Sequence, residues 1–208
     1  MLALAVMPEE IVLLMGEMEG PHFGAILQSF NPALAIVHIE TAEELETRCL
    51  IPTPGGGPRR LIAFSTSVVV PGAVLDGLGT PAYNFHPGPP TYPGSNAASF
   101  AVYEGADKFG ATAHVMEKKV DCGPIVAVKW FDVPEGIKFM DLELRTYEIL
   151  LKMFADLAPH LATSDEPLDV LDVPWSGQKH TRAEFEAMKE LEADMDEDEI
   201  GLRYRAFG

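Results

Sequence analysis

The chain has 208 residues, of which 47% are hydrophobic and 23% are charged, so it is long enough to bury the core of one domain without disulfides. Its formal net charge is −17, which repels phosphate backbones overall and argues against a nucleic-acid partner. No stretch approaches the roughly 20 apolar residues that a membrane span requires, so we expect no membrane attachment.

Strand and helix signals alternate through the first two-thirds of the chain. Short apolar runs predict buried strands at residues 11–15, 34–39, 61–64 and 82–85. Helical signals lie between and after them, at residues 23–30, from residue 41 onward, and at residues 70–78 and 96–104. Residues 52–58 (PTPGGGP) predict a loop, and since no convincing strand precedes the glycines we do not expect a phosphate cradle there. The alternation predicts an α/β fold with an open, mostly parallel, Rossmann-like sheet and helices on both faces.

The pattern changes after Gly110. Residues 111–116 and 125–131 predict two strands that pair as antiparallel neighbours, late in the sheet. Residues 141–161 predict a long amphipathic helix. A capping box at residues 181–184 predicts a further helix within an acidic tail. We therefore expect one domain over residues 1–163 and a short, acidic, helical C-terminal extension over residues 164–208.

The cysteines and the N-terminal residues bear on the compartment. Cys49 and Cys122 are far apart and show no metal or redox spacing, which favours a reducing, cytoplasmic location. The six histidines are also scattered, so no metal site is expected. The first six residues are apolar, but the run is too short for a secretion signal and lacks a basic start.

The stretch with the strongest chemical signal follows the predicted fourth strand. Asn84 and His86 are two residues apart, so on a strand they point the same way. Ligand sites of open α/β sheets gather beyond the carboxyl ends of the strands, which is where this pair falls. The loop that follows, residues 87–93, contains four prolines, and their restricted backbone can hold neighbouring groups in fixed positions.

Asp121 lies in the loop between the two later strands, next to Cys122 and Gly123. A carboxylate near a histidine favours the imidazolium form and orients the ring. Asn84 and His86 could supply N–H groups to the oxygen of a tetrahedral intermediate, and Asp121 could help to remove a proton from an attacking amine. These are the parts needed for acyl transfer to an amine. We expect His114, which alternates within a strand, to be structural.

Three separated motifs carry a resemblance to a known family. They are Asn84-x-His86-Pro87, residues 92–97 (YPGSNA), and residues 110–114 (GATAH) leading to residues 120–125 (VDCGPI). The chain resembles the catalytic domain of folate-dependent formyltransferases, shared by methionyl-tRNA formyltransferase, glycinamide ribonucleotide transformylase and sugar N-formyltransferases. The resemblance covers about residues 11–151.

The resemblance implies an enzyme that takes a formyl group from 10-formyltetrahydrofolate, with Asn84, His86 and Asp121 as its catalytic residues. It also implies that the pterin of the donor lies between two loops and is bound largely by main-chain groups. The residues implied in donor binding are Ser67, Val68, Val69, Val70, Gly94, Lys118, Lys119 and Val120.

Departures from the family pattern restrict the range of acceptors that we expect. Residues 16–20 (GEMEG) stand where the purine-synthesis enzyme has a phosphate loop, and Glu17 and Glu19 would repel a phosphate. The tail is acidic, whereas the tRNA enzyme carries a further domain for its nucleic acid. We therefore expect a small-molecule amine acceptor. A hydrolase of the same donor and a folate-binding non-enzyme are the alternatives, and a homodimer is left open.

Overall fold

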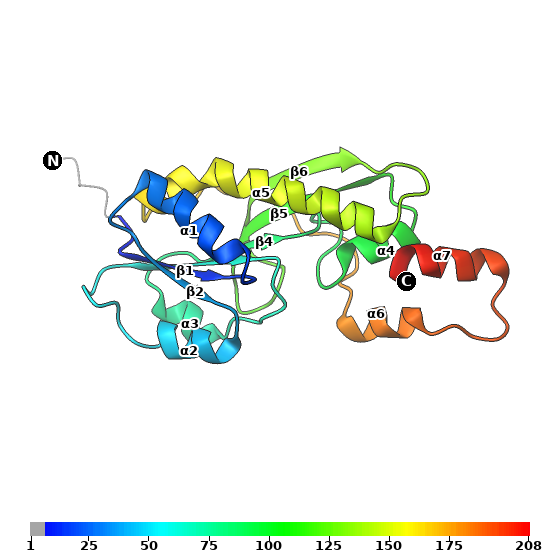
Figure 1. Ribbon diagram of the computed structural model, residues 1–208, viewed down its shortest axis with the longest axis horizontal. Coiled ribbons are helices and arrows are strands. Elements are labelled where there is room, and N and C mark those ends of the chain that lie inside the picture. The colour runs from blue at the N-terminus through cyan, green and yellow to red at the C-terminus, as the bar shows by residue number, and fades with distance from the viewer. Residues whose placement is uncertain (1–6) are drawn as a thin grey trace.

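The structure, a computed structural model, describes residues 7–208 (Figure 1). The apolar run at residues 1–6, expected not to be a secretion signal, lies outside the described residues. Six strands form one sheet in the order β2-β1-β3-β4-β5-β6. They are β1 (Glu10–Leu14), β2 (Ala35–Ile39), β3 (Arg59–Phe64), β4 (Tyr83–His86), β5 (Lys108–Val115) and β6 (Ile125–Asp132).

Both strand directions expected from the sequence are confirmed. Strands β1 to β4 pair in parallel, while β5 pairs antiparallel with β4 and β6 pairs antiparallel with β5. The helices between them are α1 (Glu19–Phe30), α2 (Ala42–Cys49), α3 (Gly72–Gly77) and α4 (Ala97–Tyr103). After the sheet come α5 (Phe139–Thr163), α6 (Arg182–Lys189) and α7 (Glu197–Phe207).

Alternate residues of the buried strands supply two cores on opposite faces of the sheet. Ile11 and Leu13 of β1 face α1 and α5, where they join Phe23 and Phe154. The intervening Val12 and Leu14 face α2 and α3, where they join residues such as Leu45 and Val74. Figure 1 shows α1 and α5 together on one side of the sheet and α2 and α3 on the other. The predicted α/β architecture is confirmed.

The C-terminal helices pack beside α4, at the end of the molecule away from α1, α2 and α3 (Figure 1). The capping box predicted at Thr181 is present, since its hydroxyl accepts the Glu184 N–H and the Glu184 side chain accepts the Thr181 N–H. Helix α7 begins within the acidic run and buries Ala206 and Phe207 against a third core that includes Phe100. The boundary between residues 163 and 164 stays a prediction.

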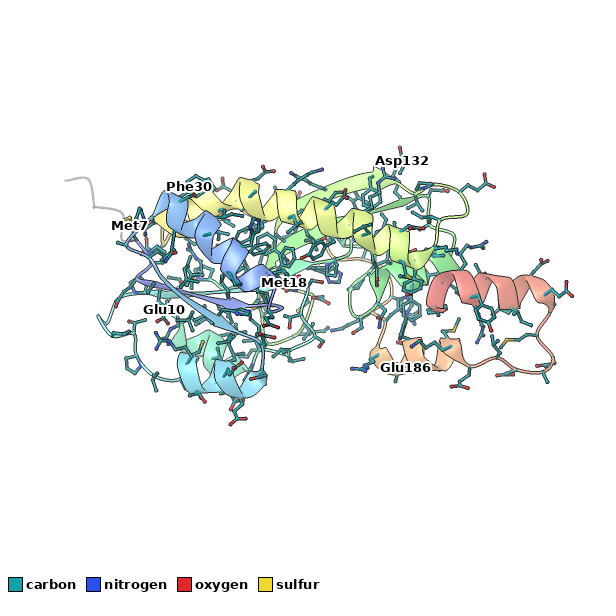
Figure 2. All side chains as sticks on the ribbon, in the orientation of Figure 1. Met7, Glu10, Met18, Phe30, Asp132 and Glu186 are labelled. Carbon is teal, nitrogen blue, oxygen red and sulfur yellow. The ribbon has the colours of Figure 1, made fainter. Side chains whose placement is uncertain are left out.

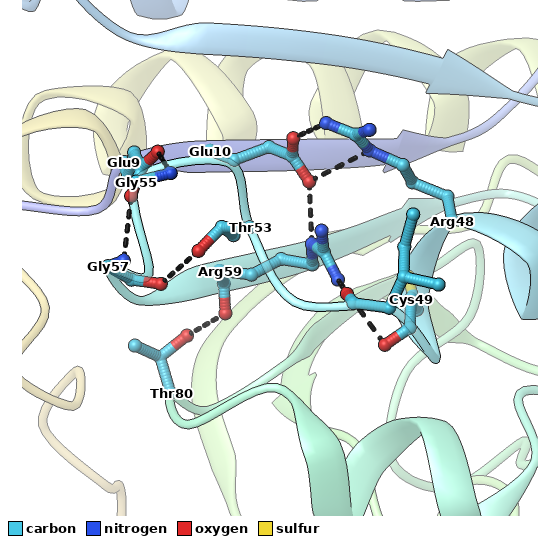
Figure 3. A network of polar contacts seen from close by, with 10 residues as sticks. Glu9, Glu10, Arg48, Cys49, Thr53, Gly55, Gly57, Arg59 and Thr80 are labelled. Atoms are coloured by element: carbon cyan, nitrogen blue, oxygen red, sulfur yellow. Dashed lines mark hydrogen bonds and ion pairs between the residues drawn. The ribbon is translucent and has the colours of Figure 1, made fainter.

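A charged cluster closes the amino end of the sheet, far from α6, as Figure 2 shows by the positions of Glu10 and Glu186. Glu10 is 1% exposed and pairs with Arg48 and with Arg59 Nε, the latter at 2.5 Å (Figure 3). The neighbouring carboxylate of Glu9 accepts the N–H groups of Gly55 and Gly57 at 2.6 and 2.7 Å (Figure 3). The glycine-rich loop therefore holds one of the chain's own carboxylates, which agrees with the expectation that it is no phosphate cradle.

Candidate active site

A cavity of about 960 Å³ lies at the carboxyl ends of β3 and β4. Its walls come from the loop after β3 (residues 65–70), from β4 with the loop that follows it, and from the loop between β5 and β6. The first turns of α5 and residues 179–186 of the C-terminal extension complete the lining. The cavity thus joins segments that are widely separated along the chain.

Asn84 and His86 both line this cavity, from the same face of β4. In the antiparallel pairing of β4 with β5, Asn84 is directly opposite His114. Facing residues of neighbouring strands place their side chains on the same side of a sheet, and Asn84 Nδ2 lies 3.1 Å from His114 Nε2. An amide carries two N–H groups, so Asn84 keeps one that is not used by this contact.

The imidazole of His86 is held from both sides. Its Nε2–H donates to the main-chain oxygen of Tyr92 at 2.9 Å, and its Nδ1 lies 4.0 Å from Asp121 Oδ2. Burial lowers the pKa of His86 and outweighs the opposing effect of the Asp121 charge, so the ring is neutral at pH 7. A neutral imidazole carries one N–H group, and the main-chain oxygen of Tyr92 accepts its hydrogen bond. The N–H expected for an oxyanion is therefore committed elsewhere, and Nδ1 is free to accept a proton.

Glycine at position 88 makes room for that ring. A Cβ at Gly88 would lie 2.6 Å from His86 Nε2 and 3.1 Å from the Tyr92 carbonyl oxygen. Both distances are shorter than a carbon atom tolerates without a shift of its neighbours. The turn that binds the imidazole therefore depends on the glycine that follows Pro87.

Asp121 is buried, with 7% of its surface exposed, and its backbone is left-handed, with φ at +50°. Oδ2 accepts the Gly94 N–H at 2.8 Å, and Oδ1 lies 3.4 Å from His114 Nε2. Burial alone raises the pKa of this carboxyl. The His114 contact, the charge of a protonated His86 and the Gly94 N–H outweigh burial, and together they lower the pKa from 3.8 to about 2. The carboxylate is ionised at every pH at which the enzyme would work.

Two loops contribute to the cavity wall at the place expected for a donor. Residues 66–70 and 119–121 line it, and Val69 and Val120 are 62% and 39% exposed. Within residues 7–208, the main-chain groups of Ser67 and Val69 form no hydrogen bond with the rest of the chain. Free main-chain donors and acceptors beside exposed apolar side chains suit a flat heterocycle with polar edges.

Comparison with known proteins assigns this region. Residues 61–155, which include Asn84, His86 and Asp121, match the family model described as formyl transferase. This part of the chain is similar to the formyltransferase family, and the match spans less than half of the 208 residues. A methionyl-tRNA formyltransferase from a Thermotoga species is 27% identical over 133 residues, which are 64% of this chain and 40% of that protein. The chain therefore aligns with less than half of that relative's length.

Solved formyltransferases share the fold well beyond the matched segment. A 4-N formyltransferase from Francisella tularensis superposes with a TM-score of 0.74 at 15% identity, covering 95% of this chain and 87% of that one. An N-formyltransferase from Helicobacter canadensis, solved with folinic acid and dTDP-3-aminofucose, superposes with a TM-score of 0.67 at 13% identity. That alignment covers 97% of this chain and 81% of the other. The coverage of 97% extends past residue 163 into the C-terminal part of the chain.

The structure brings together most of the residues that the sequence singles out. The three expected catalytic residues and seven of the expected donor-binding residues line one cavity, the seven being Ser67, Val68, Val69, Val70, Gly94, Lys119 and Val120. Lys118 is the exception. It is absent from the lining, and its Nζ lies 2.9 Å from Asp76 Oδ2 on α3. The backbone turns the Lys118 side chain toward α3, so a direct contact of this ammonium with the donor is not supported.

Sequence reasoning missed His114, which lines the cavity and whose Nε2 lies 3.1 Å from Asn84 Nδ2 and 3.4 Å from Asp121 Oδ1. A signal for it exists in the chain. Thr112 and His114 are polar residues two apart in a strand whose other central positions are fully buried. Such a pair needs partners on one face, and the same reasoning that selected Asn84 and His86 would have selected it.

Two further findings concern the described residues only. Across residues 7–208 no group of three or more His, Cys, Asp and Glu side chains is placed to hold a metal ion. No helix in that range is long and apolar enough to cross a membrane.

Proposed function

We propose that the chain transfers a formyl group from 10-formyltetrahydrofolate to the primary amine of a small-molecule acceptor, within the one-carbon metabolism of the cytoplasm. The convergence of Asn84, His86 and Asp121 on one wall of the 960 Å³ cavity carries the proposal. A pocket of that size is at the upper end of those that hold one ligand, so it offers room for a donor and an acceptor together.

The geometry supports a direct attack of the amine on the formyl carbon. As the nitrogen–carbon bond forms, the formyl oxygen becomes negative, and the free N–H of Asn84 stabilises it. Nδ1 of His86 takes the proton that the amine loses, and the Asp121 carboxylate 4.0 Å away stabilises the resulting imidazolium. The bond from the formyl carbon to the folate nitrogen then breaks, and that nitrogen receives the proton. The products are tetrahydrofolate and the N-formylated acceptor.

The relatives support the donor and the class of acceptor. The Helicobacter canadensis enzyme was solved with a folate derivative and an amino-sugar nucleotide. In this chain the proposed donor slot is formed by residues 66–70 and 119–121 together with Gly94, all of which line the cavity. The proposed donor contacts are Ser67, Val68, Val69, Val70, Gly94, Lys119 and Val120. Tyr147, which also lines the cavity, donates its hydroxyl to Glu19 at 2.6 Å. A carboxylate in that place disfavours a phosphate there.

The decisive experiment follows the loss of 10-formyltetrahydrofolate by absorbance, with and without a panel of primary amines. Loss that requires one class of amine, with formation of its N-formyl product, supports the proposal. Loss without any amine, with formate as the product, identifies a hydrolase instead. Tight binding of the folate without turnover in either condition identifies a binding protein and refutes catalysis.

A further inference from the structure

Residues 175–180, which we call the strap, run without helix or strand across the side of the sheet that carries Asn84, His86 and His114. The indole of Trp175 meets the His114 ring edge-on, with centroids 5.0 Å apart, and the His86 ring with centroids 5.7 Å apart. Its Nε1–H donates to the main-chain oxygen of Gly123 at 2.8 Å. One side chain therefore contacts both imidazoles and the loop that contains Asp121.

The strap also holds the loop after β4 by main-chain hydrogen bonds. The Ser176 N–H donates to the Pro90 oxygen at 2.9 Å, and the His180 N–H donates to the Pro93 oxygen at 3.2 Å. In return the Ser95 N–H donates to the His180 oxygen at 3.0 Å. These bonds join the strap to the loop after β4, which lies outside the strands of the sheet.

The loop after β4 also forms hydrogen bonds with the side chains of His86 and Asp121. The Tyr92 oxygen accepts the only N–H of neutral His86, and the Gly94 N–H binds Asp121 Oδ2. The strap bonds flank both positions, at Pro90, Pro93 and Ser95. A displacement of the strap would therefore move the acceptor of the His86 proton and the donor to Asp121 at the same time.

The end of the strap is anchored on the body of the domain. The buried His180 ring stacks on Phe100 of α4, with centroids 3.7 Å apart and an interplanar angle of 5°. Its Nε2 lies 3.3 Å from Glu104 Oε1. Lys179 Nζ donates to the Val120 oxygen at 3.0 Å, so the strap also touches the loop beside Asp121.

We propose that the strap positions the His86 imidazole and the Asp121 carboxylate for formyl transfer, with Trp175 as a positioning residue. This inference rests on the proposed function. Trp175 is absent from the cavity lining, so it acts on the substrates only through the histidines that it packs against. Misplacement of a reacting group by about 1 Å can cost about a hundredfold in rate, so a side chain that fixes both rings affects turnover without touching the substrate.

Two glycine substitutions in the full chain separate the effect of displacing the strap from the effect of backbone strain. Gly177 has φ at +78°, and a Cβ there would lie 2.0 Å from the Thr91 oxygen. Gly136 has φ at +71°, and a Cβ there would meet nothing within 4 Å. Gly177→Ala and Gly136→Ala thus introduce the same backbone strain, but only the former forces the strap from the loop. We expect kcat to fall at least tenfold in Gly177→Ala and to stay within twofold of the parent in Gly136→Ala.

Substitutions of Trp175 provide the second test of this inference. We expect Trp175→Ala to lower kcat about a hundredfold and Trp175→Phe, which keeps a ring against the histidines, to lower it less, with the KM for the donor within threefold in both. Histidine side-chain NMR, which needs no activity, follows the same variants. Burial lowers the pKa of His86, so solvent admitted by Trp175→Ala should raise its titration midpoint.

The outcomes separate this inference from the proposed function. If the parent chain transfers no formyl group, the proposed function fails, and the NMR titration alone tests the strap. Equal kcat values for Gly177→Ala and Gly136→Ala would overturn the inference, and so would an unchanged His86 titration in Trp175→Ala. A folded Trp175→Phe with normal kcat and an altered His86 titration would place Trp175 outside the positioning role.

Discussion

Replacement of Asp121 by asparagine tests the charge at the centre of the site. Asparagine adopts the left-handed backbone more readily than most residues, so the φ of +50° is kept. Its side-chain oxygen can still accept the Gly94 N–H, and its amide can still reach His114 Nε2. Asp121→Asn therefore removes the charge while it keeps the shape, much as protonation of the carboxyl would.

The size of the effect follows from the lowered pKa. The pKa of Asp121 falls from 3.8 to about 2 on folding, and each pKa unit corresponds to roughly 1.4 kcal/mol, so the ionised carboxylate stabilises the fold by at most about 2 kcal/mol. The part that comes from the charge of protonated His86 is absent at pH 7, where that ring is neutral. A lowered carboxyl pKa gives stability that is present above the unfolded value and is lost as the pH falls through the folded value. The contribution is therefore full above about pH 5 and about half as large at pH 3.

Urea unfolding of the parent and the variant at several pH values measures this difference. We expect Asp121→Asn to be less stable by about 1–2 kcal/mol at pH 7, and we expect the gap to narrow toward pH 3. Asp76→Asn is the matched control, because Asp76 is 64% exposed and pairs with Lys118 at the surface. A variant within about 0.5 kcal/mol of the parent at pH 7, or a gap that does not depend on pH, would refute the electrostatic reasoning.

Two further predictions concern the proposed chemistry, and two concern the donor slot. His86→Ala should lower turnover at least a hundredfold while a folate analogue binds within about threefold of its parent affinity, and near-normal turnover would exclude His86 as the proton acceptor. Since burial lowers the pKa of His86, kcat/KM in the parent should stay flat from pH 8 to 6.5 and decline only at lower pH. Lys118→Ala should leave the KM for the donor within about twofold, because its side chain pairs with Asp76, and a tenfold rise would contradict that placement. A folate analogue at about 100 times its Kd should stabilise the chain by about 2.7 kcal/mol in thermal unfolding, whereas no shift would exclude the proposed donor slot.

The architecture could be predicted from the sequence because the apolar runs of the first four strands are short and are separated by strong helix or loop signals. Strand β4 is expected at residues 82–85 and spans Tyr83–His86, and the long helix expected at 141–161 spans Phe139–Thr163. Helix α7 was harder to foresee, because its first turn is made of acidic residues that also suit a solvated tail. Asp196 caps it by accepting the Glu199 N–H, and Ala206 and Phe207 secure its far end.

The geometry of the candidate site was harder to predict from the sequence, for a different reason. Spacing along one strand shows that Asn84 and His86 share a face, but only the register with β5 shows that His114 lies opposite Asn84. The bond from His86 to the Tyr92 carbonyl also depends on a tight turn whose shape is set by tertiary contacts. Sequence patterns assign residues to faces, whereas the choice between two ring nitrogens depends on groups that no pattern reveals.

The position of the strap late in the chain has a consequence for biosynthesis. A ribosome releases the six strands and both donor loops before Trp175 emerges, and domains begin to form from their N-terminal parts during synthesis. The proposed donor slot would therefore form before the strap orders the two imidazoles. The ordering of the two imidazoles would then begin only after Trp175 has emerged and packed against His86 and His114.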